Sequence, residues 1–256
     1  MSRRLRRGKF HLKTGNMQSN APAERIKKIF YRVLSVLSYK ELPKTFVIFY
    51  SVGVLLYFIP FTRELFIAVT PLSLIFVIVS LLWHHKKWDR SFLLFIAIII
   101  TSSFLIEAVG VETGVIFGQY KYLNALGPKV FETPLIIGAN WLMLTYCSAA
   151  IMEYARRRSS GTIDVAIKIV GGALIMVMYD FTVELVAPQM GMWQFVGDYP
   201  PVENFVMWFI MALVYHIIFA GFKIKPIGKP AIALFICQTV FFLAIYLYLQ
   251  IALILN

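Results

Sequence analysis

The sequence has 256 residues, of which 59% are hydrophobic and 15% are charged. Soluble domains carry charged residues at about a quarter of their length, so this composition excludes a soluble protein and indicates an integral membrane protein. The formal net charge is +12, but residues 1–44 hold twelve Lys and Arg against two Glu and account for +10 of it. The charge is local, and we predict no nucleic-acid partner, because no nucleic-acid-binding fold accompanies it.

The N-terminal segment, residues 1–44, is predicted to be a basic cytoplasmic tail. No apolar region of signal-peptide length follows its stretch SRRLRRGKFHLK, so this stretch does not resemble a secretory signal. The next stretch, AERIKKIFYRVLSVL, has the amphipathic pattern of a helix that lies on a membrane surface. We expect the tail to bind anionic lipid headgroups, each basic residue contributing about 1 kcal/mol.

Seven apolar segments follow, each long enough to cross about 30 Å of hydrocarbon as a helix rising about 1.5 Å per residue. They cover residues 45–60, 64–83, 91–109, 134–154, 164–187, 203–223 and 230–254. Strands of a membrane barrel would instead show about ten residues of alternating polarity. We therefore predict an all-α fold, a polytopic membrane helix bundle, in which residues 45–256 form a transmembrane catalytic domain of about seven helices.

The basic connections between these segments predict the orientation in the membrane. They are HHKKWDR (84–90), RRRSSGTID (156–164) and KIKPIGK (223–229), and they alternate with connections that are not basic. Short basic loops remain on the cytoplasmic side. We expect a multi-pass protein of a prokaryotic cytoplasmic membrane, with its N-terminus inside and its C-terminus outside.

Three acidic residues are predicted to lie within the spans, near the outer end. Glu107 is expected in the last turn of the third span, and Asp180 and Glu184 in the outer half of the fifth. Residues four apart share one helix face, and two carboxyl groups in an apolar setting repel each other when both are charged. Buried acids in a membrane are costly and indicate function by default, although a structural role, such as tethering a loop, stays open for each.

Aromatic and amide side chains gather at the same end. The two long connections, residues 110–133 and 188–203, lie outside on this topology, and long loops in a compact bundle are often functional. The side chains expected there are Tyr120, Tyr122, Asn140, Trp141, Trp193, Phe195, Asn204 and Trp208. Tryptophans at this depth are also common as interfacial belt residues. An aromatic-lined hollow with acids would suit a polyene or isoprenoid end group. A protonated carboxyl group can protonate the substrate, and π faces stabilise the positive charge that results.

Other polar residues are predicted to be structural. Glu153 and Asp164 lie at inner helix ends beside Arg156, Arg157 and Arg158 and are expected to be interfacial. His216, in the inner half of the sixth span, is expected to be a core histidine with satisfied hydrogen bonds. Cys147 and Cys237 lie within spans without a CxxC or Cys/His pattern, so we expect packing roles, no disulfide and no metal site.

Several membrane chemistries are excluded by missing residues. Residues 230–254 contain no lysine for a retinal Schiff base. There is one Asp-x-x-x-Glu and no second acidic motif to hold Mg²⁺ and a diphosphate. Nucleotide and flavin fingerprints are also missing. Acid–base chemistry on an apolar substrate, without a cofactor, fits best.

The loops resemble a known family. The first motif is Glu107-x-x-Gly110-x-x-Thr113-Gly114-x-x-Phe117-Gly118-x-Tyr120-x-Tyr122, followed by Leu126-Gly127-Pro128, Pro134 and Trp141. The later motifs are Asp180-x-x-x-Glu184, Gly191-x-Trp193 and Pro201-x-x-Asn204-x-x-x-Trp208. Over about residues 45–250 the chain is similar to the membrane carotenoid-biosynthesis family that contains the CruF-type carotenoid 1,2-hydratases and the bisanhydrobacterioruberin hydratases of haloarchaea.

The resemblance implies addition of water across the terminal C1=C2 double bond of an acyclic (ψ) carotenoid end, giving a tertiary 1-hydroxy group. On this hypothesis Asp180 or Glu184 protonates C2, and Glu107, with Asn140 or Asn204, holds the water. Substrate-binding roles fall to Tyr120, Tyr122, Asn140, Trp141, Trp193, Asn204 and Trp208. The carotenoid is insoluble in water and must come sideways from the lipid bilayer.

Two alternatives remain at this point. A membrane carotenoid cyclase, or another end-group enzyme, would also protonate a ψ end, but an internal double bond would capture the cation. A non-catalytic carotenoid- or quinone-binding membrane protein would use the acids to anchor polar end groups. The choice of carotenoid and the oligomeric state also stay open.

Overall fold

The structure is a computed structural model that describes residues 35–197 and 199–255. The chain divides into two units, Met1–Val36 and Leu37–Asn256. The predicted surface helix of the N-terminal tail lies almost entirely outside the described residues. The second unit contains the predicted membrane domain.

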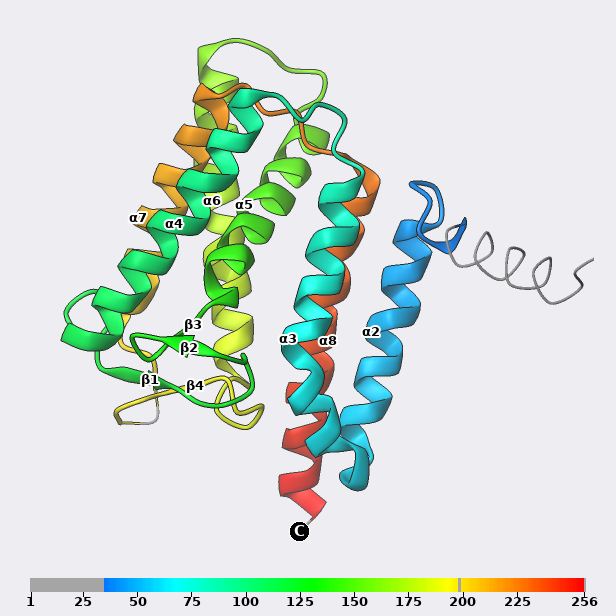
Figure 1. Cartoon of the computed structure of the whole chain (residues 1–256), viewed down its shortest axis with the longest axis vertical. Helices are drawn as coiled ribbons and strands as arrows, with labels where there is room; N and C mark the ends of the chain where they lie inside the picture. Colours follow the sequence, from blue (N-terminus) through cyan, green and yellow to red (C-terminus); the bar gives the residue numbers. More distant parts are fainter. Residues whose placement is uncertain (1–34, 198, 256) are drawn as a thin grey trace, which may run out of the picture. The chain divides into compact units, whose positions relative to one another are not determined.

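Seven helices form the described part of this unit (Figure 1). They are α2 (Leu42–Phe58), α3 (Pro60–Trp83), α4 (Arg90–Thr113), α5 (Ile136–Ala155), α6 (Thr162–Glu184), α7 (Val202–Gly221) and α8 (Lys229–Leu255). By length and composition the six helices α3 to α8 can cross a membrane, while α2, with 17 residues, is shorter. The predicted all-α polytopic bundle is confirmed, and the protein is an integral, multi-pass membrane protein.

Two helix boundaries differ by four residues from the predicted apolar segments, for local reasons. Helix α3 begins at Pro60 rather than residue 64, because proline is favoured in the first turn and forces extended backbone on Ile59 before it. Helix α4 continues to Thr113 rather than ending at residue 109. Its cap is Gly114, which has a left-handed backbone (φ 66°) and donates its N–H to the Gly110 carbonyl. Glu107 therefore lies well inside the helix and not in its last turn.

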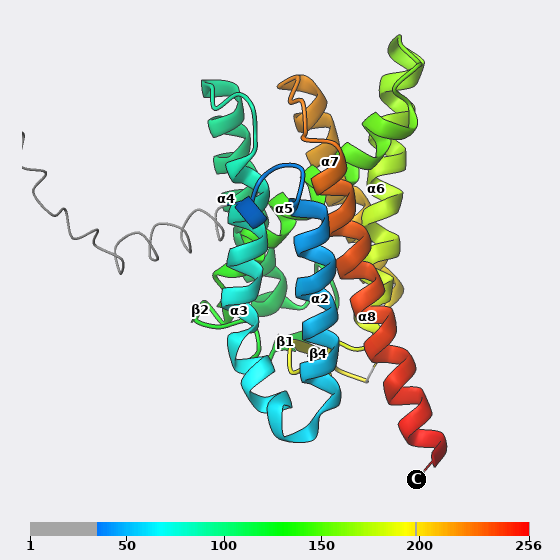
Figure 2. The ribbon, with the colours of Figure 1, turned by 90° about the vertical axis from the view of Figure 1, so that its right-hand side faces the viewer.

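The connections sort to two ends of the helix bundle (Figures 1 and 2). The basic end holds the connections 84–89, 156–161 and 222–228. The strand end holds the connections 114–135 and 185–201 and the end of α8. The alternation expected from the basic loops is therefore present in the structure.

Four short strands, which were not predicted, build the strand end. Strand β1 (Tyr120–Tyr122) pairs antiparallel with β4 (Trp193–Phe195), so that Tyr120 lies opposite Phe195 and Tyr122 opposite Trp193. Strands β2 (Lys129–Val130) and β3 (Thr133–Pro134) form a hairpin. Side chains alternate across a strand, and in β1 the two tyrosines are buried while the residue between them is exposed. The β1–β4 pair joins the two long connections into one layer.

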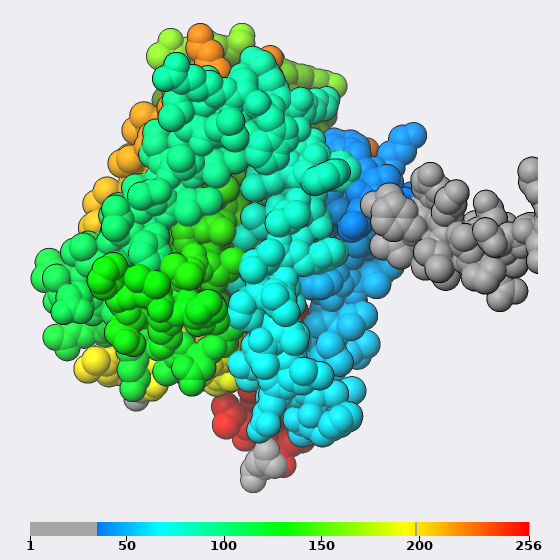
Figure 3. All heavy atoms as spheres, in the orientation of Figure 1, coloured from blue at the N-terminus to red at the C-terminus, as the bar shows by residue number. Residues whose placement is uncertain are grey.

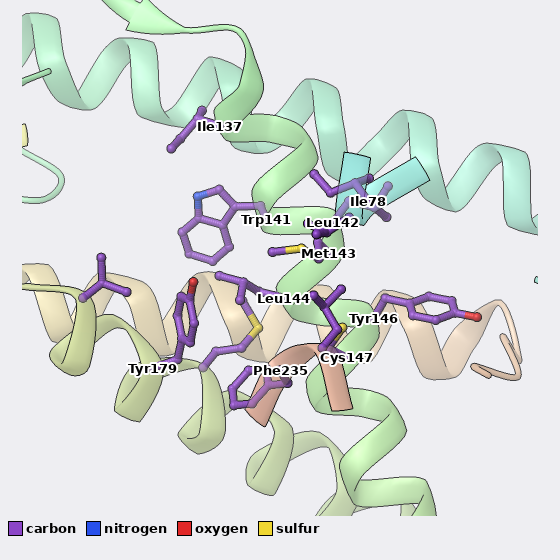
Figure 4. Packing of buried hydrophobic residues seen from close by; sticks show 14 of the residues in the cluster. Ile78, Ile137, Trp141, Leu142, Met143, Leu144, Tyr146, Cys147, Tyr179 and Phe235 are labelled. Carbon is purple, nitrogen blue, oxygen red and sulfur yellow. The ribbon is translucent and has the colours of Figure 1, made fainter. Parts of the chain in front are cut away.

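Helix α5 lies at the centre of the bundle. Every residue from Trp141 to Ala150 is buried, and Figure 4 shows Leu144 of this stretch between its backbone and neighbours such as Tyr179 of α6 and Phe235 of α8. Helices α3 and α4 lie at the surface (Figure 3) and expose large apolar side chains such as Leu72 and Leu105. This arrangement suits lipid contact for the outer helices and protein contact for α5.

Candidate active site

All ten side chains predicted to form the site line one cavity at the strand end. The cavity has a volume of about 30 Å³ and is also lined by Phe117, Ile137 and Phe195. The predicted residues come from six elements: α4, β1, α5, α6, β4 and α7. A cavity of this size can hold a water molecule where polar partners surround it. The fold thus brings together residues spread from position 107 to position 208.

Glu107 is surrounded by hydrogen-bond donors. Its Oε2 accepts from the hydroxyls of Tyr120 (2.6 Å) and Tyr122 (2.8 Å), and its Oε1 accepts from the indole N–H of Trp141 (2.9 Å). The side chain is buried. Both oxygens therefore accept hydrogen bonds, and three of the roughly four acceptor positions of the carboxyl group are used.

The two tyrosines are held in their protonated, donating form. Burial, together with the charge of Glu107, raises the pKa of Tyr120 and the pKa of Tyr122 well above the ordinary value of 10.0. Their rings come from alternate positions of β1, which is why both hydroxyls reach the same carboxyl group. The strand conformation of the motif Tyr-x-Tyr therefore directs both hydroxyl donors to Glu107.

Asp180 has a different environment, although it is equally buried. Its Oδ2 accepts from the side-chain amide of Asn204 (2.9 Å), whereas its Oδ1 has no hydrogen-bond partner. The amide N–H₂ can only donate, so Oδ2 must accept. A proton on Asp180 therefore belongs on Oδ1.

Glu184 lies one turn beyond Asp180 on the same face of α6. Both of its oxygens lie within hydrogen-bond distance of the indole N–H of Trp193, at 3.0 and 3.1 Å. Trp193 is positioned by the strand pair, where its ring meets that of Tyr122 edge to face. The expected shared face of Asp180 and Glu184 is present.

Aromatic rings form the walls of the cavity. Trp141 and Trp208 stack with ring centroids 4.1 Å apart, and Tyr120 meets Phe195 at 5.2 Å. Belt tryptophans face the lipid interface, but Trp141 and Trp208 are buried in the bundle. The belt alternative is therefore excluded for these two residues.

Asp180 also lines a second cavity, on the side of α3 and α8. This cavity has a volume of about 30 Å³ and a mostly apolar lining that includes Leu74 and Phe242. Gln238 of α8 lines it as well, and the Oε1 of this buried side chain has no hydrogen-bond partner. Gln238 is not among the residues expected from the sequence. The sequence signal that could have identified Gln238 is its polar amide side chain within a long apolar segment.

The residues predicted to be structural have structural partners. The ring nitrogens of His216 lie 2.7 Å from the Ala212 carbonyl oxygen and 2.9 Å from the Ser148 hydroxyl. At the basic end, Arg156 pairs with Asp164 at 2.8 Å. Lys168 pairs there with Glu153 at 3.0 Å.

Cys147 and Cys237 are free thiols. Among the residues that the structure describes, no group of three or more His, Cys, Asp and Glu side chains is arranged to hold a metal ion.

The fold and the cavity define a class of protein: a polytopic helical membrane protein with buried carboxyl groups and aromatic walls at one end of the bundle. A family with the description "Carotenoid biosynthesis protein" matches residues 67–255, a range that contains the whole candidate site. The chain belongs to this carotenoid biosynthesis family, as its motifs predicted. Searches of curated proteins and of solved structures find no match to the chain.

Proposed function

We propose that this member of the family is a carotenoid 1,2-hydratase, which adds water to the terminal C1=C2 double bond of an acyclic end group. The observation that carries the proposal is a pair of unlike carboxyl groups on one cavity. Glu107 accepts three hydrogen bonds, whereas the Oδ1 of Asp180 is buried and has no partner. Hydration of an alkene needs one proton donor and one proton acceptor, and these environments suit the two roles.

The first step is protonation of the double bond. The Oδ1–H of neutral Asp180 gives its proton to C2, the π electrons of C1=C2 form the new C–H bond, and Asp180 becomes a carboxylate. The amide of Asn204 keeps its hydrogen bond to Oδ2 and so holds the acid in place. The tertiary cation at C1 is stabilised by the faces of Trp141 and Trp208 and by the carboxylates.

The second step is capture of the cation by water. A water molecule beside Glu107 forms the C–O bond at C1 and gives a proton to Glu107. The product is a tertiary alcohol, and the proton then returns from Glu107 to Asp180 for the next cycle. Both carboxyl groups and Glu184 line the same cavity, which supports a short path for this return. The reaction needs neither metal nor cofactor.

The substrate reaches the site from the membrane. An acyclic carotenoid is insoluble in water, and the mostly apolar second cavity beside Asp180 faces α3 and α8. We propose access from the lipid, with the strand end outside a prokaryotic cytoplasmic membrane. The basic tail would then lie on anionic headgroups at the other surface.

The decisive variant is Asp180→Asn, because asparagine has the same shape but cannot donate a proton from an acid. Its carbonyl oxygen can still accept from Asn204. We expect hydration to fall by about 10²- to 10⁴-fold, with the amount of protein in the membrane unchanged. The measurement is chromatography and mass of carotenoids from cells that make an acyclic carotenoid, with and without the chain. Normal hydration by this variant contradicts the mechanism.

The same measurement separates the alternative functions. A hydratase adds 18 mass units per end group modified. A cyclase gives an isomer of unchanged mass and a different retention time. A binding protein leaves the pigment unaltered.

A further inference from the structure

Two residues that line the second cavity, Asp180 and Gln238, each carry one unsatisfied oxygen atom. Asp180 Oδ1 and Gln238 Oε1 are the buried side-chain atoms without a hydrogen-bond partner in the described residues. Both residues line this one cavity. Buried polar atoms are nearly always paired in folded proteins, and exceptions call for an explanation. Two unpaired oxygen atoms on residues of one cavity indicate a bound ligand that supplies the missing hydrogen bonds.

The size and lining of the cavity limit what this ligand is. Its volume of about 30 Å³ matches one water-sized group, and its walls are mainly apolar side chains from α3, α5, α6 and α8. Asn140 is a further polar residue on the lining, and it also lines the first cavity. A bare cation would need more oxygen ligands than these. A single hydroxyl group fits the space and the acceptors.

The hydrogen-bond chemistry selects a group that both accepts and donates. When Asp180 carries its proton on Oδ1, that proton needs an acceptor, and Gln238 Oε1 needs a donor. One hydroxyl group satisfies both, because its oxygen accepts from Asp180 and its hydrogen goes to Gln238. A carbonyl or an ether could accept from Asp180 but would leave Gln238 unpaired.

We propose that Asp180 and Gln238 form a buried hydroxyl-binding site, in which Gln238 is a positioning residue. Two sources share this chemistry: a water molecule, and the tertiary hydroxyl of a hydrated carotenoid end after it has left Glu107. The second source rests on the proposed hydratase function. With a carotenoid bound, Gln238 distinguishes a hydroxylated end from an unmodified one.

The first arm of the test concerns carotenoid binding. The purified protein is titrated with an acyclic carotenoid bearing a 1-hydroxy end and with the same carotenoid lacking it. If the end group is the occupant, the wild-type protein binds the hydroxylated compound about fivefold more tightly, the size of one hydrogen bond. Gln238→Met, which keeps the length of the side chain but removes the acceptor, loses this preference while still binding the unmodified carotenoid.

A matched control is Thr239→Val on the same helix. The Thr239 hydroxyl bonds to the Phe235 carbonyl of its own helix, and Thr239 is not on the cavity lining. This variant also removes a polar group from α8 and keeps the wild-type preference. Loss of the preference in Thr239→Val as well as in Gln238→Met contradicts the assignment to Gln238.

The second arm concerns water and uses the wild-type protein without carotenoid. A high-resolution experimental map shows a water within hydrogen-bond distance of both Asp180 Oδ1 and Gln238 Oε1 if water is the occupant. A dry cavity together with equal affinity for the two carotenoids overturns the proposal. Neither arm measures turnover. If the protein hydrates carotenoids but fails both arms, the hydroxyl-binding site is rejected and the hydratase function is not. If the protein passes either arm but does not hydrate carotenoids, the binding site is supported and the hydratase function is rejected.

Discussion

Glu107 and Asp180 carry the same functional group in two different hydrogen-bond environments. Three donors converge on Glu107, and two of them are tyrosines whose raised pKa values keep them protonated. Asp180 has one donor and a free oxygen. Hydrogen-bond donors favour the carboxylate form of an acid, and the carboxylate is the form that can accept a proton at the end of a reaction. A carboxyl group with a free buried oxygen is suited to give a proton at the start.

The variant Glu107→Gln tests this division of roles. Glutamine cannot take a proton from water, and its N–H₂ would face the donors that now serve the carboxyl group, so we expect hydration to fall by about 10²- to 10⁴-fold. Asp180 would still protonate the alkene reversibly. In D₂O, deuterium should therefore enter the recovered carotenoid with Glu107→Gln but not with Asp180→Asn. Mass spectrometry of the end group measures both outcomes, and the opposite pattern would exchange the two roles.

At the scale of elements, the β1–β4 pair and the α4–α5 contact position the site. The strand pair holds Trp193 against Glu184 and turns Tyr122 toward Glu107. Helices α4 and α5 supply Glu107 and Trp141, and their approach depends on Gly138. A Cβ atom added at Gly138 would lie 2.5 Å from the backbone oxygen of Ile100. Backbone atoms cannot rotate away, so the helices would have to separate.

We therefore expect Gly138→Ala to destabilise the protein by about 1–3 kcal/mol. It should also lower hydration, because Trp141 on α5 would move relative to Glu107 on α4. The measurement is thermal unfolding in detergent, combined with product yield. Gly53→Ala in α2 is the matched control, since its Cβ would meet only the rings of Phe241 and Phe66 at 3.4 Å. Equal stability of the two variants would contradict the close contact.

At the scale of the whole membrane domain, the helices place all predicted site residues at the strand end and the basic connections at the opposite end. Basic loops remain in the cytoplasm as a rule, so we expect the site on the outer side. This arrangement separates the cavity from the charged surface at the basic end.

Labelling of single cysteines tests this orientation. The two native thiols, Cys147 and Cys237, are first replaced by alanine, and one cysteine is introduced by Val196→Cys or Ser159→Cys. Val196 is exposed at the strand end, and Ser159 is exposed at the basic end. A membrane-impermeant thiol reagent should label Val196→Cys in intact cells and Ser159→Cys only after lysis. The reverse result would place the strand end in the cytoplasm.

The sequence by itself determined the class of the protein and the ends of most helices. Composition and continuous apolar runs dictate membrane helices because the bilayer offers no partner for unpaired backbone groups. The family motifs were also visible, because residues such as Glu107 and Tyr120 lie within one contiguous stretch. The sequence does not predict that α4 continues past residue 109. Gly110 and Gly114 are both candidates to end the helix, and only the structure shows that Gly114 has the left-handed conformation that ends it.

Only the tertiary structure decided how the site residues are paired. Asn204 bonds to Asp180 and Trp141 bonds to Glu107 across gaps of 24 and 34 residues, respectively. A side chain's donors depend on which helices and strands meet at it, and no spacing along the chain specifies that. For the same reason, the sequence does not predict that Asp180 of α6 and Gln238 of α8 line one cavity and that each has an unpaired oxygen there or nearby.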